Sequence, residues 1–219
     1  MELTDFHRRH AGEVGLFVGN GPNLHATPPE WFNYPSIGAN TIHRYEGWKP
    51  TYYTAVDFRL YDEFGAGVLE RFADIPKFIP RPKLDCWDGP NFYRWYHRPG
   101  KLLKPGHTPA ERDTLTEYGI AYRNIAHVAL QLFWYMGFKT VLMIGVQHGP
   151  ADAWTQHFWG NDAGQVNPNE HNRWLWMEGY KILSGAMKDA GITVLNISED
   201  THVPAECLPR GDWRNWRNA

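Results

Sequence analysis

Three short apolar runs in the first quarter of the chain each end on a small or polar residue. Residues 14–18 (VGLFV) run into Gly19, residues 36–39 end at Asn40, and residues 52–56 end at Asp57. Continuous apolar runs of this length are typical of strands that are buried on both faces of a parallel sheet. Because ligands of open α/β sheets bind beyond the carboxyl ends of the strands, the recurrence indicates a candidate site at those three ends.

The second half of the chain repeats a helix, glycine, strand pattern. Apolar residues recur at helical spacing over residues 124–136, Gly137 follows, and residues 140–144 form another apolar run. The pattern returns as a helix over 173–190, Gly191 and a strand over 193–197. A helix over 59–72 and a short strand over 77–79 complete the expected elements. Since glycine commonly ends helices, the alternation predicts a Rossmann-like α/β fold, with a mainly parallel sheet flanked by helices and right-handed crossovers.

Length and composition favour one globular domain. A chain of 219 residues can bury one sizeable core, so we expect a single nucleotide-binding domain over 1–219. Residues 81–120 carry five prolines and are expected to form an irregular insertion. Residues 146–172, rich in Gly, Asn, Asp, His and Trp, are expected to form a lid, since long irregular stretches in compact domains are usually functional.

The charge balance and the cysteines restrict the partners and the compartment. A formal net charge of -2 gives no electrostatic footprint for nucleic acid, so no such partner is expected. No apolar stretch approaches the ~20 residues that span a bilayer, so no membrane span is expected. Cys86 and Cys207 are too few for a zinc site or a disulfide framework, which favours a reducing, cytoplasmic location. An oligomer is compatible with this composition.

Aromatic residues are unusually frequent, with 11 Trp, 11 Tyr and 11 Phe. Each ring buries a large area, so one interpretation is additional packing in the core and at its rim. The other interpretation is a set of stacking platforms for a flat or sugar-like ligand.

The segment Gly19-Asn20-Gly21-Pro22-Asn23 follows the first expected strand, where a phosphate- or ribose-binding turn would lie. Glycines let the backbone approach a ligand, and free amide N–H groups can bind anionic oxygen. The segment lacks the third glycine of a dinucleotide fingerprint and the Lys-Ser or Lys-Thr of a Walker loop. The local pattern is equally compatible with a structural turn.

Histidines gather in the expected lid. His148, His157 and His171 lie there with two aspartates, but their spacings match no zinc motif, so no metal site is expected. A solvated polar lid is one interpretation, with Trp154 and Trp159 supplying its apolar closure. A histidine could instead act as a general base, because an unperturbed imidazole pKa of ~6.5 suits proton abstraction near neutral pH. His171, directly before the helix expected from Arg173, is the best placed, although it could simply cap that helix.

Several motifs together resemble a known superfamily. Residues 16–24 (LFVGNGPNL), 37–40 (IGAN) and 49–53 (KPTYY) resemble the motility accessory factor and 6-hydroxymethylpterin diphosphokinase (MptE-like) superfamily. Its core is similar to that of bacterial sialyltransferases, whose first loop reads Gly-Asn-Gly-Pro-Ser. The resemblance continues through 128–132, 135–139, 144–146, 157–158 and 177–196, and so covers most of the chain outside the insertion.

The resemblance implies a site as well as a fold. A nucleotide would be held by the strand-end residues, namely Gly19, Asn20, Gly21, Pro22, Asn23, Asn40, Asp57, Asn124, Gly145 and Gln147. The lid and acceptor side would comprise His148, Trp154, His157 and Trp159. His171 matches the segment that carries the catalytic base of the sialyltransferases.

The function implied is a metal-independent glycosyltransferase that uses a nucleotide sugar, most similar to a CMP-sugar, and needs no cofactor. Its partners would be that donor and a glycan or small-molecule acceptor with a free hydroxyl. One alternative is an ATP- and Mg²⁺-dependent diphosphokinase acting on a pterin-like alcohol. Another is a non-catalytic module that binds a nucleotide or a glycan.

Overall fold

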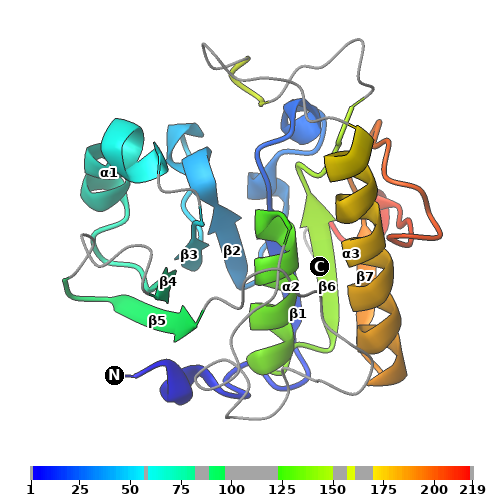
Figure 1. The fold of residues 1–219 in the computed structure, drawn as a ribbon, viewed down its shortest axis with the longest axis horizontal. Coiled ribbons are helices and arrows are strands. Elements are labelled where there is room, and N and C mark those ends of the chain that lie inside the picture. Colours follow the sequence, from blue (N-terminus) through cyan, green and yellow to red (C-terminus); the bar gives the residue numbers. More distant parts are fainter. Residues whose placement is uncertain are drawn as a thin grey trace.

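The structure is a computed structural model and describes residues 2–56, 59–81, 89–96, 123–149, 157–160 and 170–217. Within these ranges a seven-stranded parallel sheet has the order β5-β4-β3-β2-β1-β6-β7 (Figure 1). The strands are β1 (Val14–Val18), β2 (Ser36–Ala39), β3 (Tyr52–Thr54), β4 (Lys77–Arg81), β5 (Phe92–Tyr96), β6 (Thr140–Ile144) and β7 (Thr193–Asn196). This arrangement confirms the predicted Rossmann-like α/β fold.

Helices and short 3-10 turns connect the strands. The α-helices are α1 (Arg59–Arg71), α2 (Ile125–Tyr135) and α3 (Glu170–Asp189). The 3-10 turns are η1 (Leu3–Phe6), η2 (Pro22–His25), η3 (Pro29–Trp31), η4 (Asn40–Arg44) and η6 (Trp213–Asn215). Helices α2 and α3 lie side by side over one face of the sheet (Figure 1).

The strands divide their side chains between two cores, as the period of two residues in a strand requires. Phe17 of β1 and Met143 of β6 belong to the core under α2 and α3. Leu16 and Val18 of β1 point to the opposite core. Both faces of β1 are therefore buried, which explains why this strand reads as an unbroken apolar run.

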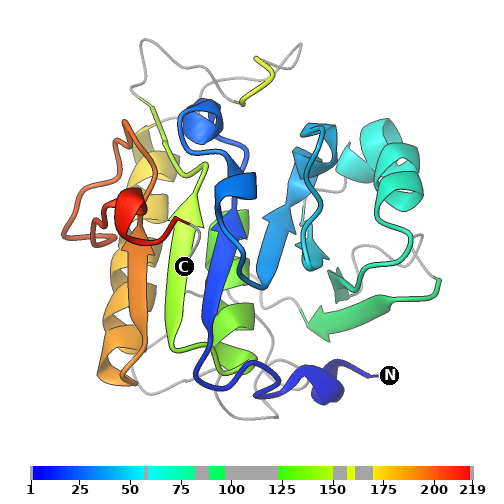
Figure 2. The ribbon, with the colours of Figure 1, turned by 180° about the vertical axis from the view of Figure 1, so that it is seen from behind.

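The face opposite α2 and α3 is closed partly by the C-terminal segment, which is red in Figure 2. Trp213 lies against Trp31 with ring centroids 4.6 Å apart, and Arg217 lies 4.3 Å from the centroid of the Trp31 ring. The Tyr34 hydroxyl donates to the carbonyl of Trp216 at 3.2 Å. Some of the many aromatic residues therefore hold the C-terminal segment against the face of the sheet opposite α2 and α3.

Two expectations about elements were wrong. Residues 92–96, inside the expected irregular insertion, form the edge strand β5, whose side chains alternate in burial and pair in register with β4. The run of prolines hid this strand, but none of those prolines lies within it. Helix α3 begins at Glu170, not at Arg173, so His171 lies in its first turn. The remainder of residues 81–120, apart from 81, 89–91 and this strand, lies outside the described residues.

The strand order places a switch point between β1 and β6. The chain moves from β1 outward through β2 to β5, and then returns to the other side of β1 with β6 and β7. In parallel sheets of this kind a ligand crevice forms at the carboxyl ends of the two strands where the order reverses. The loops after β1 and β6 therefore define the first place to look for a site.

Candidate functional site

The loops that follow β1 and β6 bind each other through their backbones. The amide of Gly19 donates to the carbonyl of Ile144 at 2.9 Å, and the amide of Gly21 donates to the carbonyl of Gly145 at 2.8 Å. These bonds extend the β1–β6 pairing past the strand ends. The two loops are therefore joined through their backbones at the switch point of the sheet.

The glycines at this contact let the two loops approach each other closely. A Cβ on Gly19 would lie 2.6 Å from the Gly145 carbonyl oxygen, and one on Gly21 would lie 2.7 Å from it. Gly145 itself has a φ of +66°. The absence of side chains at these glycines brings the two loops together, as a structural turn requires, and ligand binding by the same loop stays a prediction. Pro22 begins η2 directly after this contact.

Asn20 and Asn40 lie at the ends of β1 and β2. The Asn20 side-chain amide donates to the carbonyl of Ala39 at 3.0 Å, which joins the two strand ends. Asn40 has a φ of +49°, a left-handed conformation that asparagine tolerates better than most residues. Its carbonyl accepts a 2.7 Å hydrogen bond from the Tyr53 hydroxyl. The structure thus places Asn20 against Ala39, the residue directly before Asn40.

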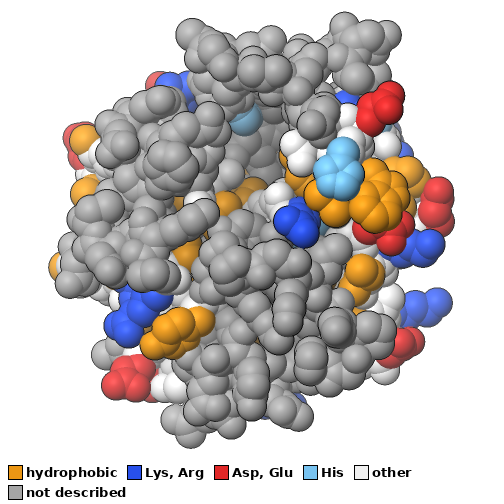
Figure 3. Space-filling view, viewed as in Figure 1, with side chains coloured by type: hydrophobic (Ala, Val, Ile, Leu, Met, Phe, Trp, Pro, Cys, Tyr) orange, Lys and Arg blue, Asp and Glu red, His pale blue; other side chains and the backbone are white. Residues whose placement is uncertain are grey.

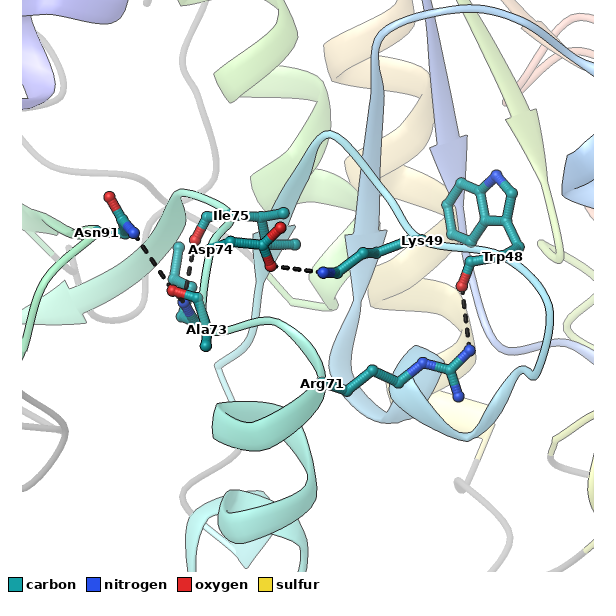
Figure 4. Close-up of polar contacts among 8 residues, drawn as sticks. Trp48, Lys49, Arg71, Ala73, Asp74, Ile75 and Asn91 are labelled. Atoms are coloured by element: carbon teal, nitrogen blue, oxygen red, sulfur yellow. Dashed lines mark hydrogen bonds and ion pairs between the residues drawn. The ribbon is translucent and has the colours of Figure 1, made fainter.

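Arg71 at the end of α1 holds the segment that follows Asn40. Its guanidinium donates to the carbonyl of Trp48 at 3.2 Å (Figure 4). It also donates to the carbonyl of His43 at 2.7 Å. Beside it, Lys49 and Asp74 form a 2.5 Å ion pair that links the same segment to the α1–β4 connection. Because one cation binds several carbonyls, this loop is fixed without regular secondary structure.

Asn23 turns toward the C-terminal part of the chain. Its side-chain amide donates to the carbonyl of Glu199 at 2.6 Å, and its side-chain oxygen lies 2.9 Å from the Cβ position of Gly21. The Glu199 carboxylate accepts a 2.7 Å hydrogen bond from the Trp213 indole. Asn23 therefore joins the first loop to the segment after β7, with only 6% of its surface exposed.

Residues at the end of β7 and just after it bind the backbone of the loop that follows β6. Both backbone groups of Val146 are bound: its amide donates to Ser198 at 3.3 Å, and its carbonyl accepts from the Asn196 side chain at 3.2 Å. The carbonyl of Gln147 accepts from the amide of His202 at 2.9 Å. Gln147 is thereby placed beside the Gly145 contact.

Buried amide oxygens without a hydrogen-bond partner mark this edge of the sheet. Within the described part of the chain they belong to the side chains of Asn20, Asn23, Asn40 and Gln147. A buried acceptor that is left unpaired costs about 1–3 kcal/mol. These four residues therefore share a side-chain oxygen that could accept a hydrogen bond from a ligand donor.

Asn124, expected to bind nucleotide, is engaged inside the protein. Its side-chain oxygen caps α2 by accepting from the amide of His127 at 3.1 Å. Its amide nitrogen donates to the Tyr180 hydroxyl on α3 at 3.3 Å, and this hydroxyl lies 2.8 Å from Nε2 of His148. Three separate elements thus meet in one polar chain.

Two histidines in this region are uncharged near neutral pH. Burial lowers the pKa of His127 to about 3. Burial, with a smaller effect of the Arg173 charge, lowers the pKa of His148 to about 4. The His127 ring fits between α2 and α3 only because Gly179 has no side chain, since a Cβ there would lie 2.1 Å from Cε1 of His127.

Residues 157–160 of the expected lid contact the first loop. The amide of Phe158 donates to the carbonyl of Asn20 at 2.9 Å, and its carbonyl lies 2.8 Å from Nε2 of His25. The His157 ring stacks on Trp159 with centroids 4.3 Å apart, and the Arg44 guanidinium lies 4.9 Å from the centroid of the Trp159 ring. His157 and Trp159 therefore lie close to the segment after Asn40.

His171 lies on the surface of the first turn of α3. Its ring stacks on Trp174, which is 57% exposed. In the space-filling view a histidine and apolar side chains gather over this end of the helix (Figure 3). Asp57 and Trp154, two other expected site residues, lie outside the described residues.

Sequence reasoning missed Tyr180, Arg71 and Tyr53. Each acts through a hydrogen bond to a distant part of the chain, and Tyr180 lies 32 residues from its partner His148. Tyr53 and Tyr180 lie within stretches that carry the resemblance, but nothing in the sequence indicates which partners their hydroxyls bind. Among the described residues, no three His, Cys, Asp or Glu side chains gather closely enough to hold a metal ion. None of the described helices is long and apolar enough to cross a membrane.

Comparisons with known proteins place the fold. No family model matches the chain, and no curated protein matches it in sequence. In fold the chain is similar to the sialyltransferase CST-II solved with a trisaccharide acceptor and CMP, with a TM-score of 0.50 and 11% identity over 90% of this chain and 86% of that one. It is equally similar to the sialyltransferase CstII from Campylobacter jejuni solved with a substrate analogue and cytidine-5'-monophosphate, with a TM-score of 0.50 and 10% identity over 91% and 85% of the two chains. The core similarity to sialyltransferases is therefore confirmed at the level of fold, while the wider MptE-like resemblance stays a prediction.

Proposed function

We propose that this protein is a glycosyltransferase that transfers a sugar from a CMP-sugar to an acceptor hydroxyl. The observation that carries the proposal is the set of unpartnered amide oxygens at the β1, β2 and β6 ends. Ribose hydroxyls and the amino group of cytosine are donors that would satisfy them. The two sialyltransferases of similar fold were solved with CMP, which supports the same choice of nucleotide.

In the proposed reaction His171 takes the proton of the acceptor hydroxyl. The acceptor oxygen forms a bond to the anomeric carbon, and the bond from that carbon to the phosphate oxygen breaks, so that CMP leaves with the electron pair. The position of His171 suits this role, because the residue is exposed in the first turn of α3, at the edge of the sheet where that helix begins. His148 is a poorer candidate, since its Nε2 already contacts Tyr180. No step in this scheme requires a metal ion.

The remaining strand-end residues would position the donor. The first loop, Asn40 and Gln147 would hold the nucleotide, and binding energy spent there would place the anomeric carbon for in-line attack. Asp57, which follows the third apolar run, is proposed for the donor side, and Trp154 of the expected lid is proposed for the lid side. A lid over 146–172 would exclude water, which competes as an acceptor.

Calorimetric titration tests the proposal, with CMP, UDP, GDP, ADP and ATP measured with and without Mg²⁺. We expect CMP to bind most tightly and EDTA to leave its affinity unchanged. Transfer from a CMP-sugar to an acceptor panel would then establish turnover. Binding of ATP alone and only with Mg²⁺ would favour the diphosphokinase instead. CMP binding without any turnover would favour a non-catalytic module.

A further inference from the structure

The hydrogen bonds around Tyr180 have a fixed direction. Because the Asn124 oxygen accepts from the backbone amide of His127, its NH₂ group is the end that donates to the Tyr180 hydroxyl. Tyr180 is fully buried, and His148 Nε2 is the other group at hydrogen-bond distance from its hydroxyl within the described residues. If Nε2 carried a proton, the buried Tyr180 hydroxyl would have no acceptor, at a cost of about 1–3 kcal/mol. The hydroxyl therefore donates to Nε2.

This direction fixes the tautomer of His148. A neutral imidazole carries one N–H, so an accepting Nε2 leaves the proton on Nδ1. His127 has the opposite form, because its Nδ1 accepts from the amide of Arg123 at 3.2 Å and its Nε2 lies 3.2 Å from the carbonyl of Trp176. Two neighbouring histidines are thus held in different tautomers by their partners.

The Nδ1–H of His148 is positioned for a ligand. The side chain is only partly buried, and no described residue accepts from Nδ1. His148 follows Gln147, and its own carbonyl accepts from the Arg173 guanidinium at 3.3 Å. The amino-terminal ends of α2 and α3, which begin at Ile125 and Glu170, add positive potential at the same edge. A ligand oxygen that carries negative charge suits this combination.

We propose that His148 donates a hydrogen bond from Nδ1 to an anionic oxygen of the bound ligand, and that Tyr180 and Asn124 lock it in the donating form. The identity of that ligand as a nucleotide rests on the proposed function. In this form His148 is not the general base. Its Nδ1–H instead selects for a ligand oxygen that accepts a hydrogen bond. Tyr180 and Asn124 act through His148 as positioning residues.

Nuclear magnetic resonance tests the tautomer without any ligand. Long-range proton–nitrogen spectra of the protein labelled with ¹⁵N-histidine distinguish the two forms, and the signal that disappears in His148→Gln assigns the residue. We expect the Nδ1–H form for His148 and the Nε2–H form for His127. Tyr180→Phe should release His148 to a mixture of both tautomers. A wild-type His148 in the Nε2–H form would overturn the proposal.

Binding variants test the donor role. In His148→Gln the side-chain oxygen can still accept from Tyr180, but the Nδ1 donor is lost, so CMP affinity should fall roughly 10- to 100-fold, the usual range for a hydrogen bond to a charged group. His148→Asn keeps an N–H close to the Nδ1 position and tolerates the φ of +49°, so it should recover most of the affinity. His202→Gln, on an exposed side chain, serves as the matched control. Equal loss in the Gln and Asn variants, or no loss, would contradict a donor at Nδ1.

The failure of this inference can be told apart from failure of the proposed function. If wild-type protein does not bind CMP, the proposed function fails. Inorganic phosphate then serves as the anionic probe, and it should shift the His148 signals in the wild type and leave those of His127 unchanged. No shift at His148 with phosphate or CMP would contradict the donor role.

Discussion

The amide of Gly21 donates a 2.8 Å hydrogen bond to the carbonyl of Gly145, and the same oxygen occupies the space that a Gly21 side chain would need. One contact thus joins the loops after β1 and β6 at the switch point of the sheet. The loop geometry depends on both glycines, since either side chain would push the two backbones apart. The contact between the two loops therefore sets the local geometry of the candidate site without any ligand.

Gly145→Ala should destabilise the fold. A Cβ there would lie 2.6 Å from the Gly19 carbonyl oxygen, and the φ of +66° is unfavourable for alanine, so we expect a loss of about 1–3 kcal/mol in the free energy of unfolding. Gly185→Ala is the matched control, because it lies in α3 with nothing within 4 Å and should gain about 0.5–1 kcal/mol. Urea denaturation measures both. Equal stability of the two variants would show that the loop contact is not needed.

Stability should fall as the pH is lowered from about 6.5, the unfolded histidine value. In the folded protein the pKa is about 3 for His127 and about 4 for His148, so below pH 6.5 the unfolded chain binds protons that the folded chain does not. Each histidine then removes at most about 1.4 kcal/mol of stability per pH unit until its folded pKa is reached.

Urea unfolding at pH 7, 6 and 5 measures this dependence. His148→Gln should remove up to half of the slope that these two residues produce, because one of the two proton sites is gone. A slope that is identical in the variant and the wild type would rule out His148 as a buried neutral group.

His171→Ala should affect turnover and leave CMP affinity nearly unchanged. A positioned general base contributes roughly 10² to 10⁴ in rate, so kcat should fall by about that factor. His202→Ala, a second exposed histidine, controls for the loss of a surface imidazole. Transfer assays with a CMP-sugar, together with calorimetric titration of CMP, separate the two effects. Full activity in His171→Ala would exclude it as the base.

Residues 157–160 should become more protected when nucleotide binds. The amide of Phe158 donates to the carbonyl of Asn20, so a ligand held by the first loop should stabilise this contact and slow exchange of the Phe158 amide by about 10-fold. Hydrogen exchange with and without CMP measures the change, and residues 183–187 of α3, where Leu183, Ser184 and Met187 are buried, supply an internal reference that should not respond. Unchanged exchange at saturating CMP would show that the segment is a fixed part of the wall.

The sequence determined the order and the kind of the elements. The apolar runs at 14–18, 36–39 and 140–144 became β1, β2 and β6 within those same bounds, because strands buried on both faces leave no polar position to confuse the pattern. It also indicated that the ends of β1 and β2 would share one edge, where the Asn20 side chain binds the carbonyl of Ala39. Strand β5 was missed because Pro90 and Pro99 flank its aromatic residues and the whole stretch was assigned to an irregular insertion.

Only the tertiary structure decided which groups the individual candidate site residues contact. Asn124 is expected to bind nucleotide, and only the fold shows that its side-chain oxygen caps α2 while its nitrogen donates to Tyr180 of another helix. His148 looked like an alternative base, but a tyrosine 32 residues away occupies its Nε2. The sequence gives the donors and acceptors that each side chain carries. Contacts between distant segments decide which partner each donor or acceptor binds. Those contacts form only when α2, α3 and the loop after β6 are packed together.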